Sequence, residues 1–132
     1  MRVGLDASGL LDPKLDALLN RRLAALIGCA FRQDIIAAVG SELGIPDAKI
    51  LALGEYPTSP LYDDKERTAL EYADAITLSG TDVDDELFER VRHHLDDGAL
   101  VELTATIAWE NTSSKFNRAL RVPSQDLWKR KR

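Results

Sequence analysis

The sequence predicts an all-α fold of about six helices. Apolar residues recur every three or four positions along most of the 132 residues, which is the helical period. No alternating segment rich in Val, Ile and Thr is long enough to predict a strand. Hydrophobic residues make up 45% of the chain, which is enough for one buried core. We therefore expect a single domain over residues 1–132, with its core at about 13–122 and a basic C-terminal tail at 123–132.

Three helices are expected in the first half of the chain. Asp12 is an N-cap followed by Pro13, so the first helix runs from about 13 to 27, where Gly28 breaks it. The second follows Cys29 and ends in the region from Gly40 to Gly44. The third begins at Pro46 and ends near Gly54, before a proline-containing loop at 56–60.

The second half predicts three more helices. Asp63 and Glu66 have the capping-box spacing, which starts a helix that ends at about Leu78. The acidic residues within 82–86 suit the positive end of a fifth helix, which carries Leu87, Phe88, Val91 and Leu95. A last long helix is predicted from about 98 to 120.

Composition excludes several classes of protein. The net charge of −5 argues against a nucleic-acid-binding body, and the basic run at 129–132 is typical of a solvated chain end. No apolar run reaches the ~18 residues that cross a bilayer, and Met1–Gly4 leads into no signal-peptide stretch. We expect a cytoplasmic protein with no membrane partner. Neither a metal nor a cofactor is predicted. The adjacent His93 and His94 diverge by about 100° on a helix, so they cannot both ligate one metal in the usual i, i+4 manner.

The segment after the first helix has the frame of a redox motif with two of its three groups missing. In C-x-x-C-x-x-x-H, two thiols and a base share one helical edge, and here these positions hold Cys29, Arg32 and Ile36. Cys29 is the only cysteine, so an intramolecular disulfide is impossible. A thiolate there gains stabilisation from the helix N-terminus and from Arg32, but a lone cysteine among apolar residues is more often a small buried side chain.

Several segments together resemble the carboxymuconolactone decarboxylase and alkylhydroperoxidase D superfamily. They occur in the family's order and span about residues 13–122, and they are Ile27-Gly28-Cys29-Ala30-Phe31 with Gln33-Asp34, Gly44-Ile45-Pro46, the run at 64–75, Val101-Glu102-Leu103-Thr104, Glu110-Asn111 and Phe116-Asn117-Arg118. The resemblance implies an all-α fold that assembles into dimers, trimers or hexamers. It also implies an active cleft near the helix that begins at the cysteine.

The departures from the family pattern limit what carries over. In the antioxidant members, the second cysteine attacks peroxide and the histidine helps to deprotonate it, so only Cys29 carries over, as the partner thiol. Those members also place a glutamate about three turns earlier as part of a proton relay. Asp16 is one residue out of that place, and we assign it no such role. Dithiol peroxidase chemistry should be absent.

Three functions stay open at this point. The first is non-redox acid/base chemistry of lyase or isomerase type on a small organic acid or lactone, in which Arg32 holds a carboxylate. A surface or intersubunit salt bridge is the alternative role for Arg32. The second is a thiol antioxidant that uses Cys29 with an external thiol. The third is non-catalytic small-molecule binding or assembly. The expected partners are a small anionic ligand and further copies of the chain. The candidate catalytic residues are Cys29, Asp34 and Glu110, and the candidate substrate-binding residues are Arg32, Phe31, Ile36, Trp109 and Asn111.

Overall fold

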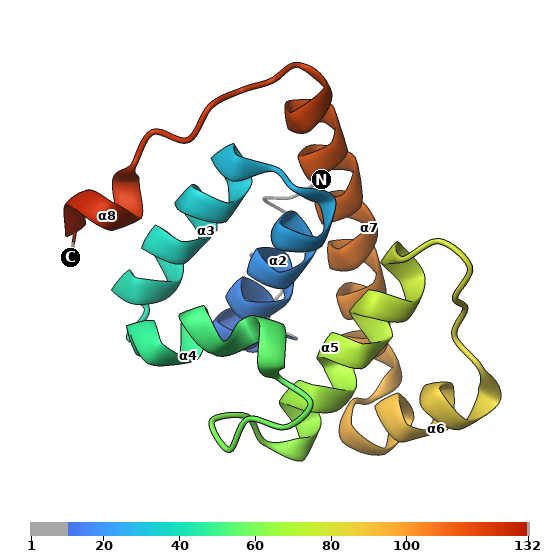
Figure 1. Cartoon of the computed structure of the whole chain (residues 1–132). Coiled ribbons are helices and arrows are strands. Elements are labelled where there is room, and N and C mark those ends of the chain that lie inside the picture. The colour runs from blue at the N-terminus through green and yellow to red at the C-terminus, as the bar shows by residue number, and fades with distance from the viewer. Residues whose placement is uncertain (1–10, 132) are drawn as a thin grey trace.

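The computed structural model describes residues 11–131 and confirms the all-α fold (Figure 1). Its elements are α2 (Pro13–Ile27), α3 (Ala30–Glu42), α4 (Asp47–Leu51), the 3₁₀ helix η1 (Ala52–Glu55), α5 (Asp64–Thr77), α6 (Asp85–His94), α7 (Asp97–Ala119) and α8 (Leu127–Lys131). Within this described range there is no strand. None of its helices combines the length and the apolar character that a membrane span requires.

Two predicted segments differ in detail from the structure. The predicted third helix is divided into α4 and η1, because its last turn tightens to a 3₁₀ helix before the proline loop. The predicted basic tail contains α8, which raises the number of α-helices within residues 11–131 to seven. The predictions for Met1–Gly4 and for Arg132 fall outside the described residues.

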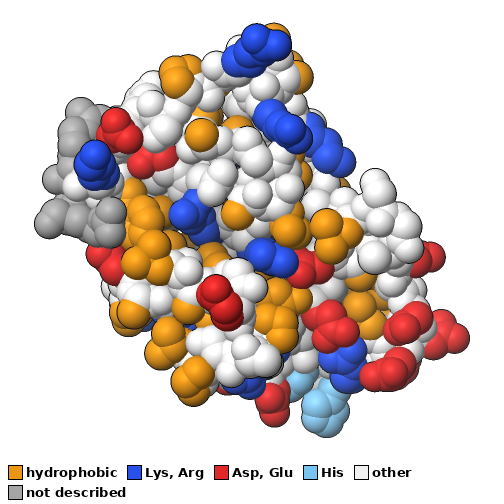
Figure 2. Space-filling model, in the orientation of Figure 1, with side chains coloured by type: hydrophobic (Ala, Val, Ile, Leu, Met, Phe, Trp, Pro, Cys, Tyr) orange, Lys and Arg blue, Asp and Glu red, His pale blue; other side chains and the backbone are white. Residues whose placement is uncertain are grey.

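Charged side chains are unevenly distributed over the surface. Figure 2 shows acidic side chains gathered over α6, with histidine beside them, and Lys and Arg side chains near the end of α7. The acidic residues Asp85 and Glu86 stand in the first turn of α6, and the cation Arg92 stands beside His93 and His94 in its last turn. Each sign therefore complements the helix dipole, which gives this cluster a structural explanation.

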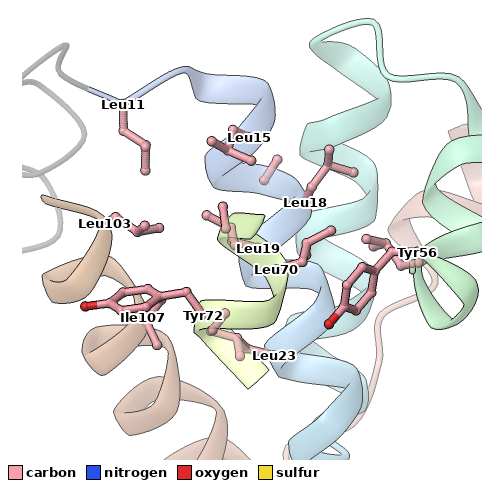
Figure 3. Close-up of a cluster of buried hydrophobic side chains, with 14 of the residues drawn as sticks. Leu11, Leu15, Leu18, Leu19, Leu23, Tyr56, Leu70, Tyr72, Leu103 and Ile107 are labelled. Carbon is pink, nitrogen blue, oxygen red and sulfur yellow. The ribbon is translucent and has the colours of Figure 1, made fainter. Parts of the chain in front are cut away.

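The core is built around α2, which packs against α3, α5 and α7. Leu18, Leu19 and Leu23 of α2 are fully buried (Figure 3). Their spacing of one, four and five residues keeps them on one face of the helix. They pack in one cluster with Leu70 of α5 and Leu103 and Ile107 of α7. These contacts fix how α2, α5 and α7 lie relative to one another.

A sharp turn between α2 and α3 sets the direction of α3. Gly28 has a φ of 84°, in the left-handed region that favours glycine, and its N–H donates to the Ala24 carbonyl at 2.9 Å. Cys29 is the next residue and the N-cap of α3. The turn brings the first turn of α3 beside α7, where Arg118 Nη1 donates to the Ile27 carbonyl at 2.8 Å.

The C-terminal helix α8 is held against α3 by one carboxylate. The Asp34 oxygens accept hydrogen bonds from the backbone N–H groups of Leu127, at 2.8 Å, and Trp128, at 3.0 Å. Trp128 is buried, and its indole N–H donates to Asp47 at 3.3 Å. The segment 123–131 therefore returns to the body of the protein.

Candidate functional site

One face of each of three helices contributes to a hollow of about 520 Å³. The lining residues recur at intervals of three and four along α2, α3 and α7, as the helical period requires. They are Leu11, Pro13, Asp16, Ala17 and Asn20 at α2, Arg32, Ile35, Ile36, Val39 and Leu43 at α3, and Glu102, Thr106, Trp109 and Ser113 on α7. The hollow is mostly apolar with a few polar groups, which is the usual character of a small-molecule site.

The structure brings three of the predicted site residues into this lining. Arg32, Ile36 and Trp109 come from α3 and α7 and face the same hollow. The other five, Cys29, Phe31, Asp34, Glu110 and Asn111, are not among its lining residues. Their predicted roles in chemistry or binding stay predictions.

Arg32 and Glu110 form an ion pair across the α3–α7 contact. Arg32 Nη2 lies 2.7 Å from Glu110 Oε1, and Arg32 Nε lies 3.2 Å from Oε2. Ser114 Oγ donates to the same Oε2 at 2.6 Å, so the fully buried Glu110 carboxylate has three donors. Burial lowers the pKa of Arg32, but the hydrogen bond and the charge of Glu110 outweigh it and raise that pKa. The positive charge at the edge of the hollow is thus already compensated.

Cys29 is buried at the junction of α2 and α3. Its exposed fraction is 1%, and its backbone N–H donates to the Ala24 carbonyl at 2.9 Å. A reagent in solution reaches this sulfur only after the junction opens. This is the environment of a small buried side chain rather than that of an accessible thiolate.

Asp34 and Asn111 have partners that explain their presence without chemistry. Desolvation alone would raise the pKa of Asp34, but the backbone N–H groups of Trp128, Leu127 and Gln125 hold that pKa below its ordinary value. Asn111 Nδ2 donates to Thr77 Oγ1 at 3.0 Å and to the Ile107 carbonyl at 3.1 Å. Both side chains therefore connect elements of the fold.

Two lining residues that the sequence analysis did not select have buried acceptor atoms without a partner. Glu102 is 6% exposed, and its Oε2 has no hydrogen-bond partner among residues 11–131. Asn20 is 2% exposed, and its Oδ1 likewise has none within this range. Asn20 Nδ2, by contrast, donates to Asp16 Oδ1 at 3.3 Å. Each residue is a polar position within an apolar helical face, which is the sequence signal that could have found them.

Asp16 also lines the hollow, although the family comparison gave it no role. Position 16 lies on the same face of α2 as Pro13, Ala17 and Asn20, and its charge contributes to the raised pKa of Arg32. Asp16 therefore lines the hollow although it is one residue away from the position of the family's glutamate.

Comparison with known proteins places this arrangement in a family. The chain is 41% identical over 117 residues to the uncharacterized protein YnjA of Escherichia coli, covering 89% of this chain and 64% of YnjA. It is 31% identical over 104 residues to the uncharacterized protein YdfG of Bacillus subtilis, covering 78% of this chain and 71% of YdfG. No family model matches the chain.

Solved structures show the same fold. ATU0492 of Agrobacterium tumefaciens, a protein of unknown function proposed to be the antioxidant defence protein AhpD, has a TM-score of 0.88 and 27% identity, covering 93% of this chain and 84% of its own. The debrominase Bmp8 has a TM-score of 0.85 and 22% identity, covering 96% and 68%. The chain belongs to the carboxymuconolactone decarboxylase and AhpD-like superfamily, as its motifs predicted.

Bmp8 has also been solved with a small ligand. A cysteine-to-alanine variant in complex with 2,3,4-tribromopyrrole has a TM-score of 0.86 and 21% identity, covering 98% of this chain and 69% of that one. At this identity the likeness shows the fold and leaves the chemistry of the present chain to its own residues.

Proposed function

We propose that this protein catalyses non-redox proton transfer, of lyase or isomerase type, on a small organic molecule bound in the hollow between α2, α3 and α7. The observation that carries the proposal is Glu102, a buried carboxylate that lines the hollow and has one oxygen without a partner in the described part of the chain. In the proposed reaction, Glu102 removes a proton from a carbon next to a carbonyl group. It then returns a proton to the product, so no electron acceptor is needed.

The surroundings of Glu102 support this role. Thr106 and Trp109 lie one and two turns further along α7 and line the same hollow. Glu102 is therefore placed where a bound substrate would meet its carboxylate with little water between them. The Arg32–Glu110 pair holds α3 against α7 beside it and keeps the hollow in shape.

The charges in the hollow bear on the expected substrate. An anionic ligand was predicted because Arg32 was expected to offer an uncompensated cation. Glu110 offsets that charge, and Glu102 adds a negative one. We therefore favour a neutral or positively charged substrate, such as a lactone or an amino compound, over a carboxylate.

A thiol antioxidant function is the second candidate, and the similarity to ATU0492 favours it. It requires Cys29 to react with peroxide and an external thiol to restore it. The burial of Cys29 and the lack of a second cysteine count against it.

Deuterium incorporation distinguishes these functions. Small lactones, ketones and amino ketones are incubated with the protein in D₂O, and proton NMR follows exchange at the carbon next to the carbonyl. We expect at least one compound to exchange, with a rate that falls about a hundredfold or more in Glu102→Gln. Cys29→Ala should keep the rate, and so should Glu89→Gln, a matched change at an exposed carboxylate of α6.

The opposite pattern overturns the proposal. If none of the compounds exchanges, and hydrogen peroxide is consumed with a thiol donor in wild type but not in Cys29→Ala, the protein acts as a thiol antioxidant. Thermal unfolding of each variant shows whether a lost activity reflects a lost fold.

A further inference from the structure

We propose that the hollow recognises a small amine, with Glu102 and Asn20 accepting hydrogen bonds from its ammonium group and the apolar wall holding its body. This inference rests on the proposed function in that it takes the same hollow as the substrate site. It adds the chemical class of the ligand.

The amide of Asn20 has a fixed orientation. Its Nδ2 donates to the Asp16 carboxylate, which accepts hydrogen bonds and has none to give when ionised. Turning the amide over would set two oxygens against each other. Asn20 Oδ1 is therefore the atom that finds no partner among the residues that the structure describes, and it is an acceptor.

Glu102 presents a second buried acceptor to the same hollow from the opposite helix. Among residues 11–131, no group donates a hydrogen bond to its Oε2. A buried acceptor without a donor costs about 1–3 kcal/mol, and a charged one costs more. A ligand with several N–H donors would satisfy Glu102 and Asn20 together.

The expected charge of the ligand follows from two ionic groups that line the hollow, Arg32 and Glu102. Arg32 is neutralised by Glu110 at 2.7 Å, whereas Glu102 has no compensating cation in the described part of the chain. A protonated amine supplies the missing positive charge and up to three donors. A carboxylate would meet Glu102 with a like charge.

The remaining wall fits an apolar body. Ile35, Ile36, Val39 and Leu43 follow one edge of α3, and Trp109 faces them from α7. A cavity of about 520 Å³ admits a single ring with a short side arm. Benzylamine has this size and charge and is the probe we choose.

Isothermal titration at neutral pH compares three probes with the same ring: benzylamine, anisole, which has no hydrogen-bond donor, and benzoate, which has the opposite charge. We expect benzylamine to bind at least tenfold more tightly than either. In Glu102→Gln its affinity should fall about ten- to a hundredfold, and in Asn20→Ala by a smaller factor. Glu89→Gln, which removes the same charge from an exposed site, should leave the affinity unchanged.

Three results overturn the inference. Tighter binding of benzoate than of benzylamine would show that the hollow is an anion site. The absence of detectable benzylamine binding would show that it is no amine site. An equal loss of affinity in Glu102→Gln and Glu89→Gln would show that only the overall charge of the protein matters.

The exchange assay tests the proposed function independently of the amine site. Benzylamine binding without any carbon-acid exchange would leave an amine-binding protein, and Glu102-dependent exchange without amine selectivity would keep the enzyme and discard the amine.

Discussion

At the scale of single residues, Arg32 replaces a cysteine of the family motif and forms an ion pair that joins α3 to α7. It stands where the antioxidant members have their reactive cysteine, and its partner is the fully buried Glu110. A charge of this kind is costly to bury alone, so each partner depends on the other. The pair therefore explains how the chain retains the family fold with a cation at that position.

Removing one partner should be strongly destabilising. Arg32→Ala leaves the Glu110 carboxylate buried with Ser114 as its one remaining side-chain donor among residues 11–131. We expect a loss of about 3–5 kcal/mol in the free energy of unfolding. Arg32→Lys should lose less, because it keeps the charge but not the forked donor. Urea unfolding followed by circular dichroism measures both.

An exposed ion pair supplies the matched control. Arg90 bonds Glu71 at 2.8 Å, with both side chains more than 40% exposed, and Arg90→Ala should cost less than about 1 kcal/mol. Equal losses for Arg32→Ala and Arg90→Ala would contradict the structural role assigned to Arg32.

Residue roles were the hardest part to predict from sequence. Arg32, Ile36 and Trp109 were selected because the family places its cleft near them, and they line the hollow. The sequence indicates Glu102 only as part of the family segment Val101-Glu102-Leu103-Thr104. A single polar residue on an apolar helical face can be a position near solvent as well as a site residue. Its significance depends on an unpartnered oxygen, which only coordinates reveal.

At the scale of elements, local signals predicted most helix boundaries. The Asp12-Pro13 start, the Gly28 stop and the Asp63–Glu66 capping box all occur in the structure. Caps depend on neighbours within a few residues, so sequence carries them directly. The docking of α8 could not be predicted this way, since Asp34 lies 93 and 94 positions before the N–H groups that it binds.

The docking of α8 should depend on pH through Asp34. Because its pKa is lower in the folded chain than in an unfolded one, the carboxylate contributes stability at neutral pH and loses it as the pH falls below about 4. In a Trp109→Phe background, the emission of the buried Trp128 should shift to the red over this acidic range. Asp34→Ala should show the shifted emission already at neutral pH.

An exposed acid in a helical first turn gives the comparison for Asp34. Asp85→Ala in α6 removes one carboxylate without touching α8 and should leave the Trp128 emission as it was. Unchanged emission in Asp34→Ala would show that α8 is held by something other than its cap.

At the scale of the whole molecule, exposed apolar side chains predict self-association. Val101 and Phe116 of α7 are 68% and 63% exposed, and Leu120, the C-cap of α7, is 63% exposed. Hydrophobic surface of this kind on a small domain favours contact with another copy. The family resemblance points the same way, toward dimers, trimers or hexamers.

Light scattering coupled to gel filtration at micromolar concentration tests the assembly. We expect a mass of at least two chains, and a smaller mass for the double variant Phe116→Ser with Leu120→Ser. Leu51→Ser, at an exposed position of α4, should keep the mass of the wild type. A wild-type mass of 14.6 kDa would refute self-association.

The central claim is that small molecules bind in the hollow between α2, α3 and α7 and not at Cys29. The most direct measurement is a titration of the ¹⁵N-labelled protein with benzylamine, followed by heteronuclear NMR. The account predicts that the largest shifts fall on Asn20, Ile36, Thr106 and the Trp109 indole, and that they disappear in Glu102→Gln. Shifts concentrated at Cys29 and Phe31, unchanged in Glu102→Gln, would contradict it.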